Sequence, residues 1–259
     1  MLALVDDAGP LVAPGSRFST QIVHDRLRAR ILSGDISAGA ELSQSLVAKE
    51  FGVSRGPVRE AFRLLQREGL IEAETNHRAR ITALSPQDVE HIYALRVVNE
   101  ALALGVSIDR FSAADLEQMD ELVQAVVESG GREFATWEQQ HQQFHALLLK
   151  HAGEGMRGSL ALWAEHTERY RRVYVINEAG GFATGLTEHE QLARACRERD
   201  ADTATRLLAQ HLSRAALVLI ATIDPAHDPA LLRAAIRQVA GTGPGVGDSP
   251  ERRSRPAKP

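Results

Sequence analysis

Apolar positions in the first third of the chain follow helical spacing in three segments and strand spacing in two. The segments 19–32, a stretch beginning at Ser43, and 55–68 carry apolar residues three or four positions apart, which predicts three helices. The runs 71–74 and 79–81 are short and rich in apolar residues, which predicts two strands. Helices followed by a two-stranded hairpin are the element order of a winged helix-turn-helix.

The pattern then changes to one helix after another, and no further strand is predicted. The predicted helices cover residues 86–107, 112–129, 132–152, 156–176, 186–199 and 201–223. Ser85-Pro86 is a typical helix start, and Ser112-x-x-Asp115 and Thr187-x-x-Glu190 resemble capping boxes. We therefore expect a mostly α fold, with an all-α helical bundle after the winged helix.

Breaks in the periodic pattern and changes in composition along the chain predict four regions. Residues 1–17 form a flexible arm, 18–84 the winged helix-turn-helix, 85–240 the helical domain and 241–259 a disordered tail rich in glycine, proline and charge.

Composition narrows the class of protein further. With 44% hydrophobic and 25% charged residues among 259, the chain has the profile of a globular protein, and no run approaches the roughly 20 apolar residues of a membrane span. The N-terminus lacks the basic and apolar regions of a signal peptide. Cys196 is the single cysteine, so no intramolecular disulfide can form. We expect a cytoplasmic protein without a membrane partner.

The net charge of −4 hides an asymmetry between the two halves. Residues 18–85 hold ten Lys and Arg against eight Asp and Glu, whereas 86–240 hold fifteen against twenty-two. Because attraction to DNA depends on local basic clusters, the negative total does not exclude a nucleic-acid partner.

The third predicted helix separates apolar and basic residues on two faces. Val58 and Phe62 belong to an apolar stripe, whereas Arg55, Arg59 and Arg63 recur every four residues and project together. The guanidinium fork suits guanine edges and phosphate oxygens. An arginine row can equally be a solvated face paired with glutamates.

A family resemblance favours the DNA-contacting role. The stretch from Ile31 to Ala73, with the S-R-x-P-V-R-E-A core that starts at Ser54 and ends at Leu64 or Leu65, resembles the winged-helix domain of the GntR family of bacterial regulators. The resemblance implies operator DNA as partner. It implies DNA contacts from the recognition helix and wing, which we assign to Ser54, Arg55, Arg59, Arg63, His77 and Arg78. Arg78 stands where the family has a glycine near the wing tip, which puts the wing contacts in doubt.

Four of the ten histidines are candidate metal ligands. His141 and His145 lie one turn apart on one helix face, His189 begins the penultimate predicted helix and His211 lies within the last. Imidazole nitrogen is a common ligand of zinc, and ligands from several helices can converge in a bundle. Ordinary core or surface positions would equally accommodate them.

A second resemblance favours the metal site. Residues 88–223 resemble the FCD ligand-binding domain of the FadR branch of the same family, through Arg96 to Glu100, the H-x-x-F-H segment ending at His145, Glu188-His189 and His211-Leu212. In metal-binding members an aspartate and three histidines hold a divalent ion, and the resemblance implies small organic acids as effectors. His141 stands where the aspartate is expected.

That substitution leaves three outcomes open. All four histidines bind the metal, or three bind it, or the metal has been lost. Replacing an anionic oxygen by a neutral nitrogen favours a transition metal, with zinc first and nickel possible.

Two arginines are candidates for holding a carboxylate effector. Arg96 could provide a positive charge inside the bundle, or could instead form a salt bridge with Glu100 one turn on. Arg171, and with it Arg172, are further candidates.

Together these features predict a homodimeric transcriptional regulator and not an enzyme. We expect a repressor that pairs through its helical bundle and senses a small acid near a metal. Two alternatives stay open: a metal-dependent hydrolase with Glu138 as its base, although no H-E-x-x-H motif is present, and a DNA-binding factor with a purely structural metal and no effector.

Overall fold

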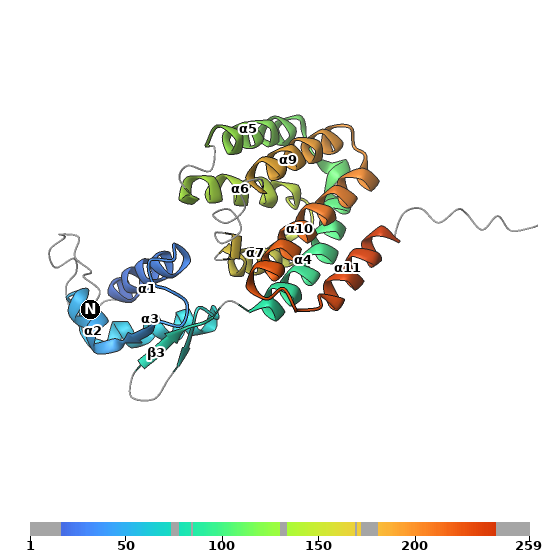
Figure 1. Cartoon of the computed structure of the whole chain (residues 1–259). Helices are drawn as coiled ribbons and strands as arrows, with labels where there is room; N and C mark the ends of the chain where they lie inside the picture. Colours follow the sequence, from blue (N-terminus) through green and yellow to red (C-terminus); the bar gives the residue numbers. More distant parts are fainter. Residues whose placement is uncertain are drawn as a thin grey trace, which may run out of the picture.

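The chain folds around two separate hydrophobic cores. The structure is a computed structural model that describes residues 17–73, 78–83, 85–129, 134–168, 170–171 and 181–241. Among these residues one cluster of buried side chains runs from Val23 to Ile81 and a second from Val89 to Ala235. Figure 1 shows the corresponding halves, with the sheet confined to the first half. On this basis we propose a boundary at residues 84–85.

The N-terminal half combines three helices with a small antiparallel sheet. Its elements are α1 (Arg17–Leu32), β1 (Glu41–Ser43), α2 (Gln44–Glu50), α3 (Arg55–Arg67), β2 (Ile71–Ala73) and β3 (Arg78–Ile81). The strand order is β1-β3-β2. In the register, Glu41 faces Arg80 across one strand pair and Ile71 faces Ile81 across the other. The predicted winged helix-turn-helix is therefore confirmed.

The strand β1 is absent from the sequence prediction. It has only three residues, and its pairing partner β3 lies more than thirty positions later, so no local periodicity marks it. Gly39 makes the turn before it, with φ of +78° and its amide nitrogen bonded to the carbonyl oxygen of Ile81. The strand ties the segment before α2 to the wing.

The C-terminal half is all helical in the part of the chain that is described. Its elements are α4 (Pro86–Ser107), the 3₁₀ turn η1 (Ile108–Arg110), α5 (Ala113–Ser129), α6 (Phe134–Leu148), α7 (Glu154–His166), α9 (Gly181–Arg197), α10 (Ala201–Ile223) and α11 (Ala230–Ala240). Ser85 caps α4 by accepting a hydrogen bond from the backbone of Asp88. Ser112 and Asp115 form the predicted reciprocal capping box of α5.

Two expectations about this half are wrong. Thr187 and Glu190 do not start a helix, since both lie inside α9, which begins at Gly181. The capping-box spacing also occurs within helices, where intrahelical bonds already satisfy the amide groups. Helix α11 was not predicted, although its eleven residues after Asp228-Pro229 carry leucine, isoleucine and valine at helical spacing. Glu90 of α4 fixes its start by accepting bonds from the amides of Leu231 and Leu232.

Helices α4 and α10 form the centre of the bundle (Figure 1). They pack along most of their lengths, and α11 covers α4 while α9 covers α10. Among the described residues, α10 is the one helix whose length and composition would suit a membrane span, and 44% of its most apolar window is buried inside the bundle. Its role as a core helix accounts for that composition.

Candidate functional site

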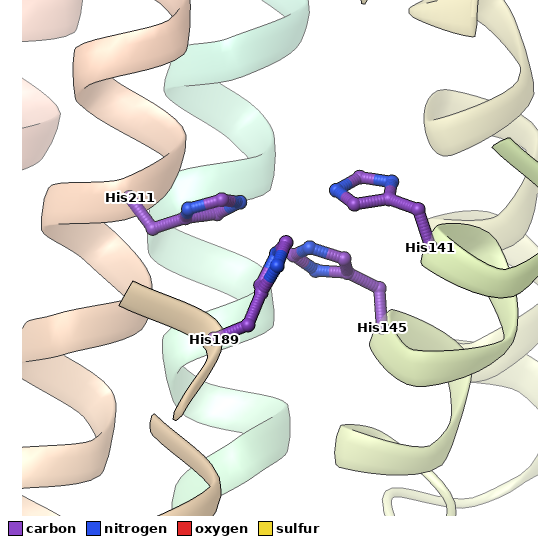
Figure 2. A group of neighbouring side chains, drawn as sticks. All are labelled: His141, His145, His189 and His211. Atoms are coloured by element: carbon purple, nitrogen blue, oxygen red, sulfur yellow. The ribbon is translucent and has the colours of Figure 1, made fainter. Parts of the chain in front are cut away.

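Four buried histidines from three helices converge in the bundle. His141 and His145 come from α6, His189 from α9 and His211 from α10. One ring nitrogen from each can be chosen so that all four lie within 4.8 Å of one another. Figure 2 shows the four rings turned toward a common point between the helices. The structure thus brings together all the predicted metal ligands, including His141.

The geometry leaves ring nitrogens without protein partners. Within the described part of the chain, no hydrogen bond reaches either ring nitrogen of His145 or His189, or Nδ1 of His141. A buried nitrogen without a partner costs on the order of 1–3 kcal/mol. Three such side chains in contact, with His211 beside them, are an expensive core unless something binds between them. This is the observation that a metal ion would explain.

Electrostatics keeps these rings in the form that binds metals. Burial is the largest cause that lowers the pKa of His141, His145 and His189 well below 6.5, and the neighbouring histidines lower it further. The rings are therefore neutral at neutral pH. Metal binding requires the neutral imidazole, so no proton has to be displaced.

Charged groups around the cluster orient its rings. His211 Nδ1 lies 2.7 Å from the carboxylate of Glu188, which also accepts two hydrogen bonds from Arg214. Burial opposes ionisation of Glu188 as the largest single effect, but these bonds together lower its pKa to about 2. A carboxylate behind a ligating histidine fixes its tautomer and strengthens it as a ligand. Trp137 stacks on His141 with ring centroids 4.7 Å apart.

The donor set fits a borderline transition metal. The four convergent side chains offer nitrogen alone, whereas calcium and magnesium prefer oxygen ligands. Zinc accepts four nitrogen ligands, and nickel accepts imidazole readily. The cluster can hold such an ion with all four rings, or with three and an open position.

A cavity of about 430 Å³ opens beside the cluster, between α6 and α7. His141 and His145 lie in its wall, together with both predicted effector-binding arginines, Arg96 and Arg171. Arg96 Nε lies 2.5 Å from Glu100, which is the alternative that the sequence left open. The structure therefore places Arg96 in a buried ion pair and at the cavity at once.

Arg171 is paired as completely as Arg96. Its Nε and Nη2 both donate to Glu138, and its Nη1 donates to the carbonyl oxygen of Ala164 and the hydroxyl of Thr167. Glu138 raises the pKa of Arg171 against the effect of burial, so the arginine stays charged. Because its carboxylate is held by Arg171, Glu138 is poorly placed to act as a general base. Arg172 lies outside the described residues.

The surface predicted to contact DNA is exposed, unlike the buried histidine cluster. On α3 the residues Val58, Ala61, Phe62 and Leu65 are buried. Arg55, Arg59 and Arg63 are exposed together on the outer side of the helix. Glu60 contacts two of these arginines, with Arg63 Nη1 3.0 Å and Arg59 Nε 3.5 Å from its carboxylate. Such exposed pairs contribute little to stability and leave the guanidinium groups available.

The remaining predicted contacts lie at the start of α3 and on the wing. Ser54 is exposed at the N-cap of α3, and no side-chain capping bond is present there. Arg78 begins β3 and lies 3.2 Å from Glu41. His77 lies outside the described residues.

Cys196 is a buried and unreactive core residue, as its place in a periodic helical stretch predicts, and burial raises the pKa of its thiol to about 12. One contact was not predicted. Arg28 of α1 links the two halves, since its guanidinium nitrogens lie 3.6 Å from Glu165 and 3.7 Å from Glu168. Charged residues in different helices carry no local signal that they will meet.

Comparisons with known proteins agree with this architecture. Residues 19–81 match the model of the bacterial regulatory proteins of the gntR family, and residues 90–214 match the FCD domain. A regulator of Streptomyces ambofaciens, described as an uncharacterized HTH-type transcriptional regulator in an unstable DNA locus, is 30% identical over 83% of this chain and 90% of its own length.

Two further proteins are similar over comparable lengths. The HTH-type transcriptional repressor GlaR of Escherichia coli (strain K12) is 24% identical over 72% of this chain and 89% of its own. The solved structure of E. coli McbR/YncC covers 80% of this chain and 99% of its own with a TM-score of 0.66 and 15% identity, which shows the shared fold. The chain belongs to the GntR family of bacterial regulatory proteins and is a DNA-binding transcriptional regulator with an FCD domain, not an enzyme.

Proposed function

We propose that this regulator is a cytoplasmic, homodimeric repressor whose operator affinity is set by a small organic acid bound beside a divalent transition metal, zinc first. The observation that carries the proposal is the cluster of four buried histidines, three of which have ring nitrogens without a partner among the described residues, next to a cavity of about 430 Å³. A cavity of this size holds a metabolite. The cation, when bound, would supply a positive charge that attracts an anionic oxygen.

The protein's own side chains define the rest of that binding site. His141 and His145 face the cavity, while His189 and His211 close the cluster from α9 and α10. Arg96 and Arg171 add positive charge near the cation, although each is balanced by a glutamate. Leu149 and Leu160 give the cavity an apolar lining. A small carboxylate suits this site, because its anionic oxygens would bind the cation and its carbon chain would pack against the apolar wall.

A chain of ion pairs offers a route from the cavity to the DNA-binding half. Glu165 lies in the cavity wall, and its carboxylate is 3.6 Å from Arg28 of α1. Arg28 Nε also donates to Glu68, which caps the C-terminal end of α3. Glu68 is bonded in turn to His24, 2.6 Å away. A ligand that moves Glu165 would therefore disturb the anchor of the recognition helix.

On the DNA-binding side, we propose that Arg55, Arg59 and Arg63 contact the operator from the major groove, with Ser54 and Arg78 at the backbone. Two copies of the chain would present two such helices to a pseudo-palindromic site. The name of GlaR, a repressor, supports repression as the sign of regulation.

The test separates metal, effector and operator. Full-length protein is stripped with a chelator, reloaded with zinc, and followed by thermal unfolding and by operator binding with a panel of carboxylates. Zinc should raise Tm by several degrees. A carboxylate that raises Tm further only in the zinc-loaded protein should change operator affinity by about 5–150-fold. If zinc raises Tm but no carboxylate changes Tm or operator affinity, the metal has a purely structural role.

A further inference from the structure

The wall of the cavity formed by α7 carries opposite charges at its two ends. Arg157 lies in the first turn of the helix and Glu165 in its last, and both line the cavity. Eight residues of helix separate them, which corresponds to about 12 Å along the axis. Between them the wall consists of Leu160, Ala161 and Ala164. A ligand in the cavity therefore lies along an apolar wall that has a positive side chain at one end and a negative side chain at the other.

Most charges around the cavity are already compensated. Glu100 pairs with Arg96, Glu138 pairs with Arg171, and Glu165 lies 3.6 Å from Arg28. The opposite charges within each pair cancel, so these residues select only weakly for the charge of a ligand.

Arg157 differs from these residues. Among the described residues no carboxylate lies within 4.0 Å of its guanidinium group, even though Glu154 is one turn away on the same helix. The side chain is exposed and borders the cavity. It is thus a cavity-lining cation whose charge is not neutralised by a described side chain. The histidine cluster provides a second point in the same cavity where an anionic oxygen would bind.

We propose that the effector is a diacid, with one acidic group at the histidine cluster and the other at Arg157. This inference rests on the proposed function and specifies the ligand class for its cavity. The body of the ligand lies against Leu149 and Leu160, both of which are buried side chains in the cavity wall. Glu165 at the other end of α7 is already paired with Arg28, whereas Arg157 offers the second acidic group a cation that no described carboxylate neutralises. A charge-assisted, bidentate pair with the guanidinium fork provides the selectivity.

The test compares acids with one and two carboxylates on zinc-loaded, full-length protein. Calorimetric titrations use adipate, suberate and sebacate, each paired with the monoacid of equal length: hexanoate, octanoate and decanoate. The best diacid should bind about tenfold or more tightly than its monoacid, in line with one added charged hydrogen bond. Arg157→Ala should remove this preference and leave the monoacid affinity unchanged.

A matched variant controls for the loss of charge. Arg206→Ala removes an exposed arginine of α10 that does not line the cavity, and the diacid preference should survive. Equal binding of diacids and monoacids to the unmodified protein would overturn the diacid proposal alone. A diacid preference that persists in Arg157→Ala would also overturn it. If no acid of either kind binds the zinc-loaded protein, the proposed organic-acid effector itself fails.

Discussion

The two halves of the molecule place their functional side chains in opposite environments. On α3 the side chains of Arg59 and Arg63 are 59% and 62% exposed, whereas all four clustered histidines are buried. An exposed arginine contributes little to folding and is free to meet a ligand as large as DNA. A buried histidine is part of the core and meets only a ligand that enters the cavity. Substituting an exposed arginine of the first half should therefore change function without changing stability. Substituting a buried histidine of the second half should change both.

The largest expected effect is on the metal centre. The double variant His145→Ala and His189→Ala removes two of the four proposed ligands, and it should reduce bound zinc from the proposed one ion per chain to essentially none. Loss of a single outer partner of a metal ligand already costs about 10–100-fold in affinity, and loss of two ligands should exceed that. Elemental analysis of the purified protein and the zinc-dependent rise in Tm are the measurements.

The control removes two histidines outside the cluster. His91 is exposed on α4 and His166 ends α7, and neither belongs to the convergent group. Their double alanine variant should keep its zinc and its zinc-dependent Tm. Stoichiometric zinc in the His145 and His189 variant would show that the cluster is not the metal site.

A smaller effect is expected from the exposed half. Arg59→Ala should weaken operator binding by about 1–3 kcal/mol, because a bidentate contact to a base or phosphate is lost. Its Tm should change little, since the side chain makes only one exposed ion pair. Fluorescence anisotropy with labelled operator measures the affinity.

Arg237→Ala on α11 is the control, because it removes the same charge from an exposed position in the other half and should bind the operator normally. Unchanged affinity in Arg59→Ala would remove this residue from the DNA interface.

The smallest expected effect concerns the link between the halves. Arg28→Ala breaks the contacts to Glu165, Glu168 and Glu68. The factor by which the effector changes operator affinity should therefore be about fivefold smaller than in the unmodified protein. The measurement is the ratio of operator Kd values with and without the most effective carboxylate of the panel. Arg30→Ala is a matched control, because this α1 arginine pairs with Glu50 inside its own half. An unaltered ratio in Arg28→Ala would show that the coupling runs elsewhere.

Local signals predicted most of the helices correctly. Helix α10 has the predicted bounds, and α4 starts at the predicted Ser85-Pro86 cap. Both features depend on residues that are neighbours in the chain, namely apolar spacing and capping side chains. The start of α9 and the strand β1 were missed, because the first has no capping signal and the second exists only through its pairing with β3.

The sequence by itself determined the residue types of both functional surfaces. The arginine row on α3 follows from helical spacing alone, and the pair His141 and His145 shares one face of α6 for the same reason. His189 and His211 were candidates from their places in the predicted helices, and the family resemblance favoured them as metal ligands.

Only the tertiary structure decided which side chains meet. It brings ring nitrogens of α6, α9 and α10 within 4.8 Å of one another, pairs Arg171 with Glu138, and leaves Arg157 at the cavity without a described carboxylate. It also joins Arg28 to Glu165 across the two halves. The physical reason is that periodicity fixes the face on which a side chain lies, whereas contacts between distant helices depend on how those faces pack. Burial, and with it the lowered pKa of His141, His145 and His189, is a property of that packing.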